Sequence, residues 1–277
     1  MVWGFTGILG NLISISAIPL VFWRMGIAAL GLLIIVNRKI FTVKLSGKDL
    51  AIIIGTGFIV ALHWISFFHA IKISTVSLAL CCMASGTLFT ALLEPLSKLK
   101  LPHWLEPLIG VVIIIGLLLI FKFEFQHKWG ILTALLSALL ASIFTVINKH
   151  LVARIPSGVI SFYEMLAGFI LIAIYGYFSN TGFYSSIMPN TSDLLWLIVL
   201  GLVCTAIAFA ISVEVMKHLS AYTVALAINL EPVYAIILAL LIFGDSEKMT
   251  FGFYVGAAII LLGIFGYPVI KRKLKIA

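Results

Sequence analysis

Runs of about 20 consecutive apolar residues recur along this 277-residue chain, and they limit what it can fold into. Each run is long enough to cross a hydrocarbon core of roughly 30 Å as a helix. A segment in lipid has no water to satisfy its backbone, so it must be helical. The charged fraction of 10% also lies well below the roughly 25% of a soluble domain. We therefore expect an all-α membrane protein.

We predict ten transmembrane helices from these runs. Their residues are 1–13, 17–36, 49–70, 75–96, 103–121, 129–151, 157–178, 192–216, 220–243 and 250–270. The first helix is too short to span at a rise of about 1.5 Å per residue. It is expected either to be truncated, with its true start upstream, or to be a half-span.

Lysine and arginine residues fall unevenly on the two sides of the predicted membrane. With the N-terminus inside, four lie outside, Arg24 lies within a span, and thirteen lie inside: Arg38, Lys39, Lys44, Lys48, Lys98, Lys100, Lys149, Arg154, Lys217, Lys271, Arg272, Lys273 and Lys275. Cytoplasmic connections accumulate positive residues. We therefore expect both termini in the cytoplasm and the protein in the plasma membrane, the inner membrane of a bacterium. The net charge of +8 then reflects topology and not nucleic-acid binding.

The two halves of the chain are similar when they are overlaid. KDLAIIIGTG at 48–57 matches SDLLWLIVLG at 192–201, and residues 70–80 match residues 215–226 with one insertion. Five helices per half make the second copy start on the opposite side of the membrane, which produces an inverted repeat. Such repeats are typical of secondary transporters, with the substrate near the midplane. We predict two five-helix repeats, 1–121 and 129–271, in one membrane domain around a central cavity.

Four segments carry a family resemblance: WGFTGILG at 3–10, AIPLVFWRMGIAAL at 17–30, LLEPL at 92–96 and NLEPVYAIILALLIFGD at 229–245. In these segments the chain resembles the EamA-type ten-helix exporters of the drug/metabolite transporter superfamily, and the similarity covers essentially the whole chain. The resemblance implies a 5+5 inverted repeat, a central cavity and export of small metabolites such as amino acids. It does not imply one substrate. Family members often have Gly-Glu at the end of helix nine, where this chain has Gly244-Asp245.

Polar residues inside the spans mark the candidate site, because an ionisable group there costs roughly 2.5–3.5 kcal/mol and normally faces the bundle interior. His63 lies near the middle of the third helix, Phe67 shares its face one turn later, and Trp64 lies beside them. The residues expected to bind substrate are His63, Trp64, Phe67, Met83, Thr87, Thr145, Asn148 and Asn229. The alternatives are that His63 only bonds a neighbouring helix and that the hydroxyl residues serve close helix packing.

Three further charges within spans, Arg24, Glu164 and Glu231, are expected to serve gating or coupling. Arg24 and Glu164 are equivalent in the overlay but lie at opposite depths, so we do not expect them to pair; binding a substrate carboxylate is the alternative for Arg24. Glu231 precedes Pro232, which removes a helical hydrogen bond. It is compatible with pairing to a substrate amine, carrying a proton or holding two helices together.

No enzyme is indicated, because the chain has no Gly-rich phosphate loop, no metal-ligand spacing and no Ser-His-Asp set on one side of the membrane. No cofactor and no metal are expected. The favoured function is export of small amphipathic metabolites, amino acids above all, by alternating access. Two alternatives stay open: proton-coupled uptake or exchange of such metabolites, and a lipid-handling or scaffold protein without an aqueous substrate. Formation of a homodimer is also left open.

Overall fold

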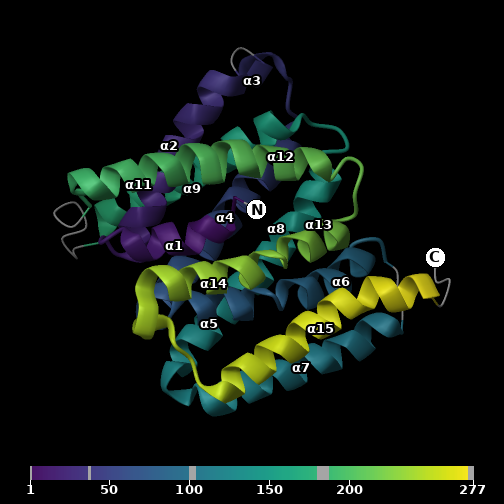
Figure 1. The fold of residues 1–277 in the computed structure, drawn as a ribbon. Coiled ribbons are helices and arrows are strands. Elements are labelled where there is room, and N and C mark those ends of the chain that lie inside the picture. Colours follow the sequence, from purple (N-terminus) through teal and green to yellow (C-terminus); the bar gives the residue numbers. More distant parts are fainter. Residues whose placement is uncertain (1, 37–38, 100–103, 180–186, 274–277) are drawn as a thin grey trace.

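The computed structural model describes residues 2–36, 39–99, 104–179 and 187–273, and all regular secondary structure within them is helical (Figure 1). This confirms the all-α class. The α-helices are α1 (Gly4–Leu12), α2 (Ala17–Val36), α3 (Lys39–Thr42), α4 (Gly47–Ile73), α5 (Val76–Met83), α6 (Gly86–Leu96), α7 (Leu105–Phe123), α8 (Lys128–Leu151), α9 (Ser157–Phe178), α11 (Thr191–Gly201), α12 (Ala208–Val215), α13 (Ala221–Ile228), α14 (Glu231–Phe243) and α15 (Phe251–Lys273). Short 3₁₀ turns, η1 (Phe125–His127) and η3 (Gly244–Glu247), follow α7 and α14, and a π-helical segment, η2 (Leu202–Ile207), joins α11 to α12.

Eight helical stretches in the described residues are long and apolar enough to cross a membrane: Ala17–Val36, Gly47–Ile73, Val76–Leu96, Phe125–Leu151, Ser157–Phe178, Thr191–Val215, Ala221–Glu247 and Phe251–Lys273. They coincide with eight of the ten predicted helices. Of the other two, α1 has 9 residues, whereas α7 has 19 and lies close to the predicted range 103–121. The short α1 agrees with the expectation that the first helix is too short to span the membrane. The chain leaves α1 at Leu12 because Ser14 turns away to bond Asp193 through its amide (2.8 Å) and hydroxyl (2.6 Å).

Two of the predicted helices are interrupted near their middles. The fourth, expected to be continuous, breaks into α5 and α6 at Ala84 and Ser85, and the ninth breaks into α13 and α14 at Asn229 and Leu230. Pro232 follows the second break in the first turn of α14, where a missing amide hydrogen costs little. α5 packs against α14 and α6 against α13, so the two broken helices lie side by side and antiparallel (Figure 1).

The first amides of each broken helix donate to a carboxylate that belongs to the other broken helix or directly follows it. Glu247, just after α14, accepts bonds from the Val76 amide (2.9 Å), the Ser77 amide (2.9 Å) and the Ser77 hydroxyl (2.7 Å) at the start of α5. Glu94 in α6 accepts a bond from the Tyr222 amide (2.8 Å) at the start of α13. Anions stabilise helix N-termini, whose first amides have no partner within the helix. The two carboxylates therefore fix how the broken helices lie against each other.

The helix contacts repeat between the two halves in reciprocal form. α4 of the first half packs on α9 of the second, and α11 and η2 of the second half pack on α2 of the first. Likewise α4 packs on α8, and its counterpart α11 packs on α1, the counterpart of α8. In the same way α8 packs on the broken helix α5–α6, and α1 packs on α14 of the other broken helix. α7 lies along α15 at the lower edge of Figure 1. Such reciprocity is the pattern that a two-fold repeat produces.

Equivalent glycines mark the closest approaches in this pattern. Gly57 of α4 lies directly against the backbone of Glu164 in α9, and Gly201 of α11 lies against Ile27 and the carbonyl of Arg24 in α2. These are the glycines that coincide when the two halves of the sequence are overlaid. The backbones at Arg24 and Glu164 therefore occupy corresponding contacts.

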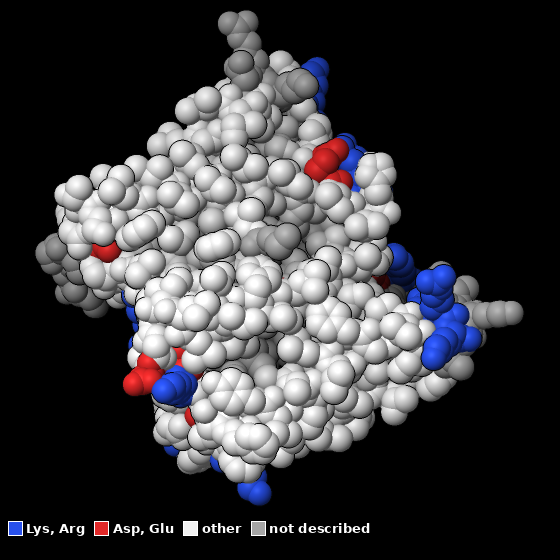
Figure 2. Space-filling view, in the orientation of Figure 1, with Lys and Arg blue, Asp and Glu red and all other residues white. Residues whose placement is uncertain are grey.

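The outer surface is apolar over a broad middle zone. Exposed side chains there include Ile211 in α12, Ile237 and Leu241 in α14 and Leu262 in α15. On the face in Figure 2 this zone carries no charge, and Lys, Arg, Asp and Glu gather toward the helix ends. An apolar belt between charged rims is what contact with a lipid bilayer requires. Arg38, Lys100 and Lys275, which count toward the predicted orientation, lie outside the described residues.

Candidate functional site

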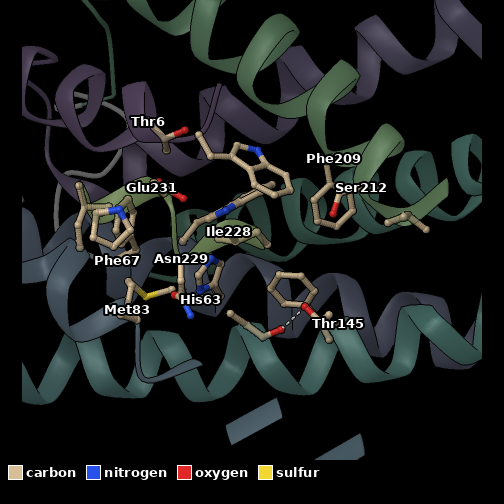
Figure 3. A pocket seen from close by; sticks show the side chains of 18 of the residues that line it. Thr6, His63, Phe67, Met83, Thr145, Phe209, Ser212, Ile228, Asn229 and Glu231 are labelled. Atoms are coloured by element: carbon tan, nitrogen blue, oxygen red, sulfur yellow. Dashed lines mark hydrogen bonds between the residues drawn. The ribbon is translucent and has the colours of Figure 1, made fainter. Parts of the chain in front are cut away.

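A cavity of about 130 Å³ lies between the two halves, and α1, α2, α4, α5, α8, α12, α13 and α14 supply its walls (Figure 3). A cavity of roughly 150 Å³ holds a benzene-sized molecule, so the space suits a small ligand. The polar residues that line it are Thr6, Arg24, His63, Thr145, Ser212, Asn229 and Glu231. The aromatic residues are Trp3, Trp64, Phe67, Phe144 and Phe209.

The interruptions of the two broken helices open onto this cavity. Met83 and Ala84 from the first break, and Asn229 and Glu231 from the second, are all lining residues. Interrupted helices at corresponding positions of two repeats are a marker of substrate sites in membrane transporters, because the freed helix ends present polar backbone and side chains at mid-membrane depth. Asn229 also links the two broken helices where they cross, because its side-chain amide donates to the Thr87 hydroxyl.

Arg24 is the most constrained charge in the cavity wall. Its side chain is 1% exposed, its Nε donates to the Thr205 hydroxyl at 2.7 Å, and its guanidinium carbon lies 3.8 Å from the centre of the Trp64 ring. No carboxylate within the described residues pairs with it, and its Nη1 has no hydrogen-bond partner there. A buried guanidinium that is stacked and held at Nε but unpaired at Nη1 is prepared to receive an anion.

The position of Thr205 depends on the π-helical segment η2. The Thr205 hydroxyl donates to the Leu200 carbonyl at 2.7 Å, five residues earlier, and accepts from Arg24. A π-helical turn adds one residue to the helical repeat and so shifts the following side chains around the axis; such turns often occur at functional sites. Here the shift brings the Thr205 hydroxyl within hydrogen-bond distance of the Arg24 guanidinium.

His63 is held from behind by the neighbouring helix α8. Its Nδ1 lies 2.9 Å from the carbonyl oxygen of Ser137, which can only accept, so we infer that Nδ1 carries the hydrogen. The Ser137 hydroxyl in turn donates to the His63 carbonyl at 2.9 Å. In a neutral imidazole this leaves Nε2 as an acceptor. His63 therefore bonds a neighbouring helix, as one interpretation of the sequence expects, and it also lines the cavity.

Aromatic rings surround His63. Its ring centre lies 5.4 Å from that of Phe144 and 6.4 Å from that of Phe67. Phe209 joins the group, at 5.9 Å from Phe144 and 6.0 Å from Trp64. Ring centres at these distances pack favourably, and the four pairs include stacked, tilted and edge-to-face arrangements. Together they form an apolar face that suits a flat or aliphatic side chain.

The structure separates the residues predicted from sequence into two groups. His63, Trp64, Phe67, Met83, Thr145 and Asn229 line the cavity together with Arg24 and Glu231. Thr87, Asn148 and Glu164 do not. Thr87 lies behind Asn229, and Asn148 donates to Glu164 at 3.2 Å in a buried pair of its own.

Among the polar and aromatic lining residues, the site predicted from the sequence lacks five: Trp3, Thr6, Phe144, Phe209 and Ser212. Phe144 directly precedes Thr145, a predicted site residue, and lies one turn after the lining residue Ala141; Phe209 lies one turn before the lining residue Ser212. That spacing could have found them. Trp3 and Thr6 gave no comparable signal, because only α1 packing between α4 and α14 brings them to the cavity.

Within the described residues no group of three or more His, Cys, Asp or Glu side chains is arranged to hold a metal ion. The three cysteines, Cys81, Cys82 and Cys204, are unpaired and buried. They serve as small packing residues.

Comparisons with known proteins place this arrangement in a family. The EamA-like transporter family matches residues 1–122 and 128–267. An uncharacterized transporter of Clostridium kluyveri is similar at 25% identity over 244 residues, which cover 84% of this chain and 77% of that protein. A solved crystal structure of a protein shares the fold with a TM-score of 0.71 at 16% identity, and covers 98% of this chain and 95% of that one. Since the family match takes in most of the sequence, the chain belongs to the EamA-like transporter family.

Proposed function

We propose that this membrane transporter exports small zwitterionic metabolites, with amino acids as the substrate class, by alternating access. The observation that carries the proposal is the composition of one cavity. Arg24, a buried cation with no carboxylate partner among the described residues, and the carboxylate of Glu231 line the same space as an aromatic cluster. An amino acid has the three complementary parts: a carboxylate, an ammonium group and a side chain.

Each part has a partner in the proposed complex. Arg24 Nη1 donates to the substrate carboxylate, and the Thr205 and Trp64 contacts keep the guanidinium in place before the substrate arrives. Glu231 and the Nε2 of His63 accept from the ammonium group. The rings of Trp64, Phe67, Phe144 and Phe209 receive the side chain. This gives Arg24 a binding role in place of the expected gate. A lipid-handling or scaffold protein would not need two opposite charges in a small internal cavity, since burying them is costly.

Alternating access is proposed to arise from two inverted five-helix repeats, 1–121 and 129–271. The reciprocal helix contacts support this arrangement. The two broken helices supply flexible points where they cross beside the cavity, because the helical hydrogen bonds are interrupted there. The excess of Lys and Arg on one side supports cytoplasmic termini.

Two contacts at opposite ends of the molecule are candidates for the gates. Asp49, at the start of α4, binds Arg154 between α8 and α9 at 2.6 Å. Asp193, at the start of α11, binds Ser14 between α1 and α2 at 2.6 Å. The two aspartates coincide in the sequence overlay, and each holds a connection of the other half. Opening one end while the other stays closed requires breaking one of these contacts at a time.

Counterflow in proteoliposomes tests the proposal. Vesicles preloaded with one amino acid should take up labelled amino acids, and uptake should weaken for an amino alcohol that lacks the carboxylate. In Arg24→Gln, loss of a charge-assisted hydrogen bond of about 1.5–3 kcal/mol should weaken apparent affinity for the amino acid about 10- to 100-fold. The amino alcohol should be nearly unaffected by the substitution.

The matched control is Arg272→Gln, an exposed arginine near the end of α15, which should leave both substrates unchanged. Equal losses for the amino acid and the amino alcohol in Arg24→Gln would remove Arg24 from the carboxylate site. Absence of counterflow for every amino acid in the wild-type protein would refute the substrate class.

A further inference from the structure

A second buried polar cluster lies beside the cavity and does not line it. Asn148 in α8 donates through Nδ2 to Oε2 of Glu164 in α9 at 3.2 Å, and both residues are 0% exposed. The other oxygen of each, Oδ1 of Asn148 and Oε1 of Glu164, has no hydrogen-bond partner among the described residues. The hydroxyl of Ser161, 0% exposed and one turn before Glu164, is also without a partner there. Three buried oxygen atoms on adjoining helices thus have no hydrogen-bond partner among the described residues.

No cation compensates Glu164 among the side chains that the structure describes. The helices α2, α3, α4 and α12 pack on α9, and α8 reaches it through Asn148. Their charged and titratable groups bond elsewhere: Arg24 to Thr205, His63 to Ser137, Asp49 to Arg154, Lys72 to the Ile13 carbonyl, Glu214 to Lys217 and Lys149 to the Met216 carbonyl. Lys48, His69 and His150 are exposed, Lys128 is at the opposite end of α8 from Asn148, and the side chain of Lys39 lies outside the described part.

An unpaired carboxylate in such a place is costly, because a buried charge without a partner loses its hydration and gains nothing in return. A bound proton removes the charge and turns one carboxyl oxygen into a donor. Once protonated, Oε1 is a donor in a cluster where the amide oxygen of Asn148 has no donor among the described residues. One proton therefore removes the uncompensated charge and supplies a donor that the cluster lacks.

We propose that Glu164, positioned by Asn148, is a proton-binding site that couples proton entry to substrate export. This inference rests on the proposed function for its coupling step. Glu164 takes a proton from external water when the outer side is open and releases it to cytoplasmic water when the inner side is open. The substrate crosses in the opposite direction between these steps.

The surroundings of the site connect it to both the cavity and the moving parts. Asn148 lies one turn after Thr145, a lining residue of the cavity on the same face of α8. α12, which carries the lining residues Ser212 and Val213, packs on both α8 and α9. α4 of the first half presses on the Glu164 backbone at Gly57. Movement of one half against the other therefore alters the junction that encloses Glu164.

Glu164→Gln tests the coupling, because glutamine has the size of the protonated acid and cannot bind or release a proton. With one proton per substrate, a pH difference of one unit supports about a tenfold concentration ratio of substrate across the membrane. The wild-type protein should reach this ratio, and Glu164→Gln should fall to a ratio of one while it retains counterflow. The control Glu214→Gln, an exposed carboxylate paired with Lys217, should behave as the wild type in both assays.

A second measurement needs no substrate. Infrared spectra of the purified protein at neutral pH should contain a carbonyl band of a protonated carboxylic acid that is missing in Glu164→Gln and present in Glu214→Gln. Retained tenfold accumulation in Glu164→Gln, an unchanged infrared band, or accumulation driven by sodium in place of protons would each overturn the inference. If the wild type fails to exchange any amino acid but the band depends on Glu164, the substrate proposal fails and the proton site stands.

Discussion

The closest approach between α4 and α9 provides a direct test of the packing. A methyl group added at Gly57 would lie 2.5 Å from the carbonyl oxygen of Glu164, 2.9 Å from its Cα and 2.9 Å from the Cβ of Ala167. Two of these three atoms belong to the backbone, so no rotamer change relieves the contact. Gly57→Ala must push the two helices apart.

Gly55, two residues earlier in the same helix, is the matched control, because a methyl group there meets nothing within 4 Å. Overpacking costs typically about 1–3 kcal/mol, and we expect the upper end because backbone obstructs the new methyl. Both substitutions replace glycine by alanine in a helix, a gain of about 1 kcal/mol in soluble helices. This gain cancels in the comparison. Gly57→Ala should therefore be about 3 kcal/mol less stable than Gly55→Ala.

Unfolding by sodium dodecyl sulfate in mixed micelles, followed by circular dichroism, measures this difference. Gly201→Ala should fall between the two variants. Its new methyl would meet the side chain of Ile27 at 2.6 Å but the carbonyl of Arg24 only at 3.3 Å, and side chains yield more easily than backbone. Equal stability of Gly57→Ala and Gly55→Ala would show that α4 and α9 do not touch at this point.

Three further predictions concern other contacts. Glu247→Gln should lower the free energy of unfolding by about 1–3 kcal/mol in the same assay, because an amide replaces a carboxylate oxygen that faces the donors at the start of α5. Asp49→Asn, which breaks the partly exposed pair with Arg154, should change stability by less than about 1 kcal/mol; labelling of engineered cysteines at that end should nevertheless increase. Trp64→Leu should cost at least about 2 kcal/mol through loss of the ring stacked on Arg24, and Trp64→Phe should cost less.

The spans could be predicted from the sequence because lipid imposes a length on every helix and leaves the backbone no alternative. The two interruptions could be predicted only in part. Pro232 marks the break at Asn229, but the break at Ala84 carries no proline and is followed only by Gly86. It arises where α5 and α6 cross the other broken helix, which is a tertiary effect. The π-helical segment around Thr205 likewise has no signal in its own residues.

The candidate site could be predicted where one helix carries it. His63, Trp64 and Phe67 share a face of α4, so helical spacing was enough to group them. Helical spacing alone does not show which of several polar helix faces lines a cavity. Thr87 and Thr145 both sit on polar stripes, yet only Thr145 lines the cavity, because Asn229 covers Thr87. The sequence likewise suggests a gating role for Arg24, because it indicates how deep the residue lies in the membrane. It does not indicate that Thr205 and Trp64 are its neighbours.

The sharpest difference between the halves lies at Arg24 and Glu164. Their backbones occupy corresponding contacts, since equivalent glycines press on both. Their side chains do not: Arg24 turns to Thr205 and the cavity, whereas Glu164 turns to Asn148 and away from it. Corresponding backbone positions thus carry a cation in one half and a carboxyl group in the other, so one movement of the halves affects both groups. In the proposed cycle, rocking the halves carries the carboxylate held by Arg24 toward one side while it exposes Glu164 for proton exchange. Substrate and proton can then be moved in opposite directions by a single rearrangement, without the two ever sharing a site.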